Sequence, residues 1–130
     1  MKKLIVILIV FAVMVGAMTG EIVYVNKFYN GIQADLENIE ISINANERHV
    51  ANNETVALCQ ALSDKWEKGK TNLLMLQNHN TVRNFDDKIV CLVKVVKSDN
   101  YNDAVIFVSS AINYIDDVLL DSMPYVSNIF

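Results

Sequence analysis

The sequence predicts an all-α protein: an N-terminal transmembrane helix that continues into a long helix, followed by a small antiparallel helical bundle or hairpin. Three observations lead to this fold class. Apolar residues after Val25 recur at alternating steps of three and four, the spacing of one helix face. The 130 residues include only four Gly and one Pro, so few positions interrupt a helix. Residues that favour helix ends stand where the apolar pattern breaks.

The first element is an uncharged segment, residues 4–20, which follows Lys2 and Lys3. As a helix it would span about 25 Å, slightly less than a hydrocarbon core of about 30 Å. After Glu21 the apolar character resumes with Ile22–Val25. A carboxylate at this depth lies near the outer interface, where its cost is far below the midplane value. The segment therefore predicts a membrane-spanning helix.

We interpret residues 1–25 as an uncleaved signal-anchor and residues 26–130 as an extracytoplasmic helical domain. The two lysines place the N-terminus in the cytoplasm by the positive-inside rule, which makes the chain a single-pass protein of the cell membrane. A cleaved signal peptide is the alternative, because small residues at Val15-Gly16-Ala17 resemble a cleavage site. We favour the anchor because the apolar run is long and Ile22–Val25 extends it.

Small residues repeat at every fourth position within the anchor, at Ala12, Gly16 and Gly20. This spacing lets two helix backbones approach closely in lipid, so the three residues are a candidate transmembrane dimer face. The alternative is that small residues are simply common in membrane helices.

Past the membrane, the first helix is predicted to continue to about Glu47, with Gly31 as a weak point. The second helix begins near Asn53, taken as its N-cap, and ends at the polar stretch Gln77–Thr81. The third runs from about Val82 to Lys97. The predicted core positions of these three helices are Val25, Tyr29, Ile32, Leu36, Ile39 and Ile43; then Cys59, Leu62, Trp66, Leu73 and Leu76; then Val82, Phe85, Ile89, Leu92 and Val96.

The fourth helix is predicted over Tyr101 to Ser122, with Asn100 as its cap and Asp103 completing an approximate capping box. Pro124 ends it before a short tail. Its predicted core positions are Tyr101, Val105, Val108, Ile112, Ile115 and Leu119, and the apolar face is widened by Ile106, Phe107, Ala111, Tyr114 and Val118. So wide a face indicates contact with more than one neighbour.

An even number of cysteines outside the membrane suggests a disulfide, but we favour the alternative that Cys59 and Cys91 are buried free thiols. In a hairpin that turns near His79 they would miss each other by about 12 Å along the axis, too far for a disulfide. Their spacing is also not that of a metal site.

The remaining composition excludes several classes of function. A net charge of −4, with two of the eleven basic residues at Lys2 and Lys3, disfavours nucleic-acid binding. No motif for a catalytic nucleophile, a cofactor or a metal is present, so we predict no enzyme, no cofactor and no metal site. His49 and His79 are expected to be a solvated residue and a capping residue. The adjacent acids Asp86-Asp87 and Asp116-Asp117 are interpreted as solvated helix faces.

Several short motifs resemble a known family. They are Trp66-Glu67-Lys68, Leu76 to His79, Ile89 to Ala104 with Asp99 in the turn, and Asn128-Ile129-Phe130. In this order, behind a Lys-Lys anchor, they resemble the uncharacterised single-anchor bacterial proteins of domain-of-unknown-function family 4363. In that family acidic residues usually follow the turn histidine, whereas Asn80 and Thr81 follow it here.

The resemblance implies a small membrane-anchored helical protein without known enzymatic activity, encoded near multi-spanning membrane proteins. We therefore predict a membrane-tethered extracytoplasmic interaction module that binds a multi-spanning membrane protein or itself. Trp66 and His79 are its candidate structural or interaction residues, with core packing the default for Trp66. The alternative is a ligand-sensing domain in which the wide face of the fourth helix lines a pocket.

Overall fold

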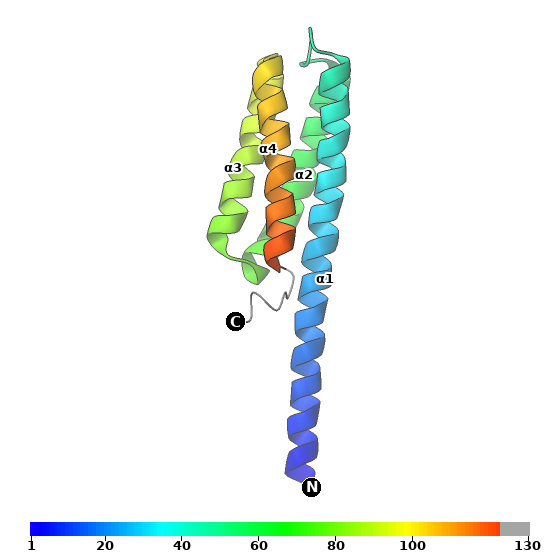
Figure 1. The fold of residues 1–130 in the computed structure, drawn as a ribbon, viewed down its shortest axis with the longest axis vertical. Helices are drawn as coiled ribbons and strands as arrows, with labels where there is room; N and C mark the ends of the chain where they lie inside the picture. The colour runs from blue at the N-terminus through cyan, green and yellow to red at the C-terminus, as the bar shows by residue number, and fades with distance from the viewer. Residues whose placement is uncertain (123–130) are drawn as a thin grey trace.

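The computed structural model describes residues 1–122, which form four helices in an antiparallel bundle (Figure 1). They are α1 (Lys2–Ala45), α2 (Asn53–Leu76), α3 (His79–Lys97) and α4 (Tyr101–Ser122). The all-α fold class is confirmed. The predicted tail after Pro124 and the motif Asn128-Ile129-Phe130 lie outside the described residues.

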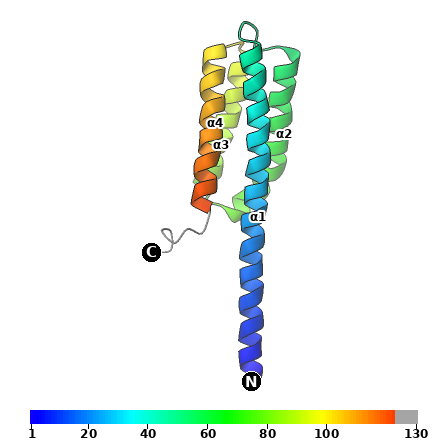
Figure 2. The same cartoon turned by 45° about the vertical axis from the view of Figure 1, so that its right-hand side comes forward.

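The bundle is a ring in which α1 packs on α2, α2 on α3, α3 on α4 and α4 back on α1. Each helix runs antiparallel to both neighbours, as short connections favour. At 44 residues, α1 is about 66 Å long, and its N-terminal half projects beyond the end of the bundle (Figures 1 and 2). The end of the bundle from which it projects, where α2 meets α3 and α4 ends, is called the base; the opposite end is called the top.

The core follows the predicted three-four pattern closely in three helices. Every predicted core position of α1 and α3 is buried. In α2 the same holds, except that Leu76 is only partly buried, and Thr55 and Gly69 join the buried face. The hydroxyls of Ser42 and Thr55 are 2.6 Å apart in the interface of α1 and α2, so each satisfies the other away from water.

In α4 the buried line differs from the predicted one. Val108 and Ile115 are buried as expected, but Ala104, Ala111 and Val118 complete the line. The expected Tyr101, Val105, Ile112 and Leu119 flank the core instead, and Ile106 is exposed. Large side chains were favoured by the sequence pattern, whereas the small Ala side chains let α4 approach α1 and α3 at once.

The helix ends also required corrections. Asn52, not Asn53, caps α2, because its side chain accepts the backbone N–H of Thr55 at 2.9 Å. Asn78 caps α3, which therefore begins three residues before Val82. The predicted cap of α4 is confirmed: the Asn100 side chain accepts the Asp103 N–H at 3.1 Å and donates to its carboxylate at 2.8 Å.

Both cysteines are free thiols, as predicted, but only Cys59 is buried. Cys91 is partly exposed because it lies beside the core line of α3 rather than on it. Burial raises the pKa of the Cys59 thiol to about 11, so this thiol is protonated and unreactive at neutral pH.

Candidate functional site

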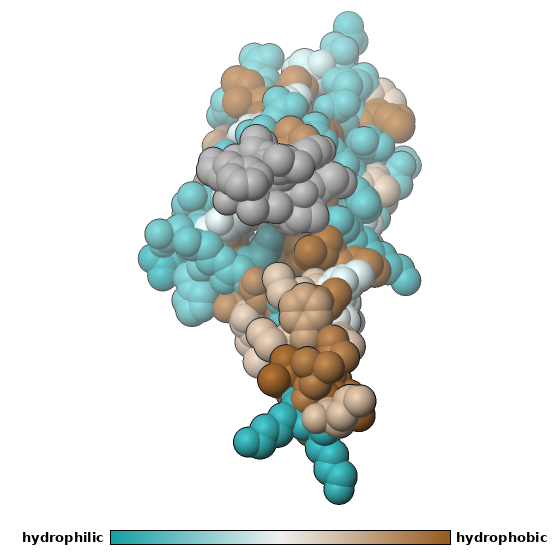
Figure 3. Space-filling model, turned by 60° about the horizontal axis from the view of Figure 1, so that its bottom comes forward, coloured by the Kyte–Doolittle hydropathy of each residue, from teal (hydrophilic) through white to brown (hydrophobic). Residues whose placement is uncertain are grey.

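The projecting half of α1 is the largest exposed apolar surface of the described protein. Every residue from Met1 to Glu21 is exposed, including all the large apolar side chains of this segment. Figure 3 shows this apolar surface in brown, with hydrophilic side chains at its tip. The helix is long and apolar enough to cross a membrane, and none of its most apolar window is buried against the bundle. The segment is thus compatible with a single-pass anchor.

The small residues Ala12, Gly16 and Gly20 lie on this projecting half. No atom lies within 4 Å of where a Cβ would stand on Gly16 or Gly20. At about 100° per residue, the three small residues centre on the side of α1 opposite the buried line through Tyr29 and Leu36. The predicted dimer face therefore points away from the molecule's own α2–α4.

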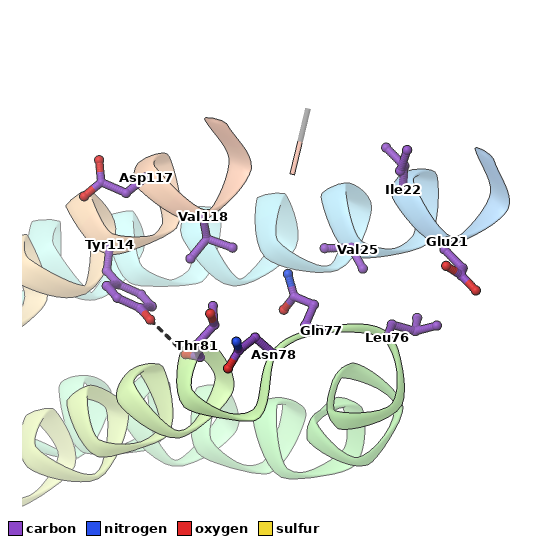
Figure 4. Close-up of a pocket in the computed structure, with 10 residues that line it drawn as sticks. All are labelled: Glu21, Ile22, Val25, Leu76, Gln77, Asn78, Thr81, Tyr114, Asp117 and Val118. Atoms are coloured by element: carbon purple, nitrogen blue, oxygen red, sulfur yellow. Dashed lines mark hydrogen bonds between the residues drawn. The ribbon is translucent and has the colours of Figure 1, made fainter. Parts of the chain in front are cut away.

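An open cleft lies at the base of the bundle, where α1 enters it. Its volume is about 380 Å³. Its lining residues come from α1, the end of α2, the α2–α3 connection, the first turn of α3, and α4; they are Glu21, Ile22, Val25, Leu76, Gln77, Asn78, Thr81, Tyr114, Asp117 and Val118. Figure 4 shows the Gln77 side chain directed between Val25 of α1 and Val118 of α4.

Two tyrosines hold the wall of this cleft in place. The Tyr29 hydroxyl donates to Oε1 of Gln77 at 2.9 Å. The Tyr114 hydroxyl donates to the Thr81 carbonyl at 2.9 Å (Figure 4). Burial of Tyr29 raises the pKa of its phenol well above the usual range, so the hydroxyl remains a donor. The α2–α3 connection is therefore fastened to α1, and the first turn of α3 is fastened to α4.

Trp66 is a core residue in this structure, buried among Phe28, Tyr29 and Phe85. Its ring meets that of Phe85 edge-on at 4.8 Å between centroids. Its indole N–H donates to Oδ1 of Asp86 at 2.8 Å. Core packing, which the sequence favoured for Trp66 over an interaction role, agrees with this placement.

Asp86 was interpreted as part of a solvated face, and for this residue the interpretation was wrong. Its carboxylate is half-buried and accepts bonds from Trp66 and from Nζ of Lys70, the latter at 3.3 Å. Lys70 also contacts Glu67 at 3.1 Å, and the bonds to Glu67 and Asp86 together raise the pKa of the Lys70 ammonium. Asp87, its neighbour, is exposed as expected.

The two histidines lie at opposite ends of the bundle. His79 is the exposed first residue of α3, next to the Asn78 cap rather than the cap itself. His49 is exposed at the top, where its Nδ1 lies 3.2 Å from Oδ2 of Asp99. Oδ1 of Asp99 accepts the Ala51 N–H at 3.0 Å, so this carboxylate joins the two connections of the top. The structure does not bring either histidine into the basal cleft.

The Asp99 contacts could not be found from the sequence, because they join residues about fifty positions apart. The Ala51 N–H and His49 lower the pKa of the Asp99 carboxyl. Asp99 also has a φ of 58°, a left-handed conformation that Asn and Asp adopt more readily than most residues. Among residues 1–120, whose side chains the structure describes, no group of three or more His, Cys, Asp or Glu side chains is arranged to hold a metal ion.

Comparison with known protein families gives a match that covers the whole bundle. A family model described as Domain of unknown function (DUF4363) matches residues 20–129, which includes the bundle and leaves out most of the projecting half of α1. No curated protein and no solved structure gives a significant match. Because the model covers nearly the whole chain, this protein belongs to the DUF4363 family.

Proposed function

We propose that the protein is a membrane-tethered interaction module. In this proposal α1 spans the cell membrane with its N-terminus in the cytoplasm, and the bundle stands outside. The observation that supports it most directly is the continuity of α1. One unbroken helix supplies a wall of the bundle core and then an apolar segment exposed around its whole circumference. An all-round apolar helix is suited to lipid rather than to water.

The partner is a second transmembrane helix, either of a multi-spanning membrane protein or of another copy of this chain. The face of Ala12, Gly16 and Gly20 is open and points away from the bundle. A helix packed there would meet neither α2 nor α4 of the same molecule. Two copies could thus pair through α1 with their bundles on opposite sides.

Crosslinking in intact membranes tests this proposal, followed by affinity capture from detergent extracts. We expect a homodimer or a membrane-protein partner, and we expect Gly16→Leu to reduce the yield because the larger side chain separates the helices. Met14→Leu is the matched control, since Met14 lies on the opposite side of α1. A strictly monomeric chain without neighbours would rule the proposal out. A chain shortened near Ala17 would show cleavage and rule out the anchor.

Ligand sensing is the second candidate, and the basal cleft is the observation that favours it. Its volume of about 380 Å³ falls within the usual range for ligand sites, and α4 contributes Tyr114, Asp117 and Val118 to its lining. The cleft lies at the end of the bundle, however, so it is lined by the last turns of α4 and not by the whole wide face of that helix. A small molecule that raises the melting temperature in the wild type but not in Gln77→Ala would support it.

That the protein is not an enzyme stays a prediction. His79 is exposed at the start of α3, and His49 contacts Asp99 at the far end of the bundle. If a measured turnover were abolished by His79→Ala, the prediction would be wrong.

A further inference from the structure

The length of the projecting helix determines how far the bundle stands from the membrane. Residues 4–20 span only about 25 Å as a helix, which is short of a hydrocarbon core of about 30 Å. The missing length is supplied by continuing to Val23, since twenty residues from Leu4 span about 30 Å. An anchor that fills the core therefore ends at Val23, which is already at the base of the bundle.

The base of the bundle is level with this point. Ile22 lines the basal cleft together with Leu76, the last residue of α2, and with Val118 near the end of α4. Leu120 lies two residues beyond Val118 toward the base, and Met75 directly precedes Leu76. No spacer separates the bilayer from the ends of α2 and α4.

The exposed apolar side chains of the bundle concentrate at this level. Among described residues after Gly20, seven large apolar side chains are exposed, and four of them lie at the base. These four are Val23, Tyr24, Met75 and Leu120, hereafter the basal rim. Met75 is 82% exposed and Leu120 is 54% exposed. The other three, Ile41, Val90 and Ile106, lie singly on α1, α3 and α4, farther up the bundle.

The cleft explains how a charged residue is accommodated at this depth. Glu21 is the one acid within the apolar stretch that runs from Leu4 to Val25. It lines the open cleft together with the side chains of Gln77 and Asn78 (Figure 4). Glu21 is exposed at the open end of the cleft, so its carboxylate reaches water where the anchor meets the headgroups, instead of hydrocarbon.

We propose that the base of the bundle rests in the interfacial layer of the bilayer, with the basal rim as a second lipid-contacting surface. The occupant of this surface is the lipid bilayer itself, because the surface is continuous with the apolar segment of α1 and lies at the depth that the anchor length requires. The bundle then stands upright, and its top with His49 and Asp99 is the part most distant from the membrane. This inference rests on the proposed function, since it needs α1 to be an anchor.

The test measures the depth of single cysteines in the full chain. Variants Met75→Cys and Leu120→Cys are made in a Cys59→Ala, Cys91→Ser background, labelled with an environment-sensitive fluorophore, and reconstituted in phosphatidylcholine vesicles with nitroxide-labelled lipid. The matched controls are Ile41→Cys and Ile106→Cys, which are 68% and 63% exposed but lie about 27 Å and 21 Å farther up their helices than Val23 and Leu120. Circular dichroism confirms that each variant keeps its helices.

We expect several-fold stronger quenching at Met75 and Leu120 than at Ile41 and Ile106. A further label at Val10→Cys separates the two proposals. Strong quenching at Val10, with Met75 and Leu120 quenched no more than Ile106, would overturn the basal contact and leave the anchor standing. Absence of quenching at Val10 would overturn the anchor and the basal contact together.

Discussion

The two halves of α1 are one continuous helix with opposite patterns of exposure. From Leu4 to Gly20 the helix is uncharged on every side, and all of its residues are exposed. From Val25 to Ile43 it is apolar along one line, which is buried, and polar around much of the rest. The change occurs within about one turn, at Glu21 to Val25.

This contrast shows what each half of the helix is suited to. A single apolar line indicates partners on one side only, and α2 and α4 supply them. A surface that is apolar on all sides has no preferred direction, so no single protein neighbour can cover it, whereas lipid can. A charged substitution should therefore have different effects in the two halves of α1.

The largest expected effect is a charge placed on the buried line. Leu36→Asp puts an unpaired carboxylate into the core, at a cost of several kcal/mol against a total stability of about 5–15 kcal/mol. We expect loss of cooperative unfolding by circular dichroism in detergent, with membrane association retained. Ala34→Asp, at an exposed position of the same helix, should unfold like the wild type. If both variants behaved alike, the bundle half would not depend on its buried line.

The reciprocal change places the charge in the projecting half. Val10→Asp should cost about 2.5–3.5 kcal/mol of membrane insertion, because an acid at the centre of a spanning helix is strongly disfavoured. We expect the chain to be extracted by alkaline carbonate, while the melting temperature of the bundle is unchanged. Val10→Leu serves as the control and should remain in the membrane. Equal extraction of the Asp and Leu variants would contradict the anchor.

The glycines of the bundle have close neighbours, whereas those of the projecting half of α1 do not. A Cβ on Gly69 would overlap the Phe28 ring, so Gly69→Ala forces the ring to move and should cost about 1–3 kcal/mol. A Cβ on Gly31 would stand 3.2 Å from Nζ of Lys65, the mobile end of a side chain. Gly31→Ala should therefore be neutral or stabilise by up to about 1 kcal/mol through helix propensity.

Denaturant unfolding in detergent measures these differences. Gly16→Ala, where the surrounding space is open, should leave bundle stability unchanged. Equal stabilities for Gly69→Ala and Gly31→Ala would mean that Phe28 does not pack on α2 as described.

The smallest expected effect concerns the exposed contacts at the top. The pKa of Asp99 is lowered in the folded protein, so its contribution to stability is present above its ordinary pKa of about 3.8 and is lost as the pH falls below that value. Asp99→Asn removes the charge while keeping a residue that tolerates the φ of 58°. We expect a small decrease in melting temperature at pH 6 that shrinks as the pH falls below about 3.8. A difference in melting temperature between Asp99→Asn and the wild type that grew toward low pH would contradict the lowered pKa of Asp99.

Much of the fold could be predicted from the sequence, and the departures have identifiable causes. The core lines of α1 and α3 were correct because large apolar residues recur there without ambiguity. The line of α4 was displaced because Ala104 and Ala111 carry little hydrophobic signal. Adjacent asparagines at 52 and 53 left the cap of α2 one residue uncertain, since both have the right side chain.

The candidate site was predicted less well than the fold. The exposed apolar segment with Ala12, Gly16 and Gly20 was visible in the sequence because its signal is local composition. The basal cleft was not, since its lining residues, from Glu21 to Val118, come from segments far apart in the sequence. The same holds for the bond from Trp66 to Asp86, which requires α2 and α3 to be in register.

Periodicity, capping residues and composition are local properties of the chain. They were therefore enough to predict a helical protein, the course of its helices and the half of α1 that lacks a one-sided pattern. Three features needed the assembled bundle: the buried face of α4, the level at which α2 and α4 end beside the apolar segment, and the bonds by which Asp99 joins the two connections at the top. Those features depend on how four helices are placed against one another, which no local pattern encodes.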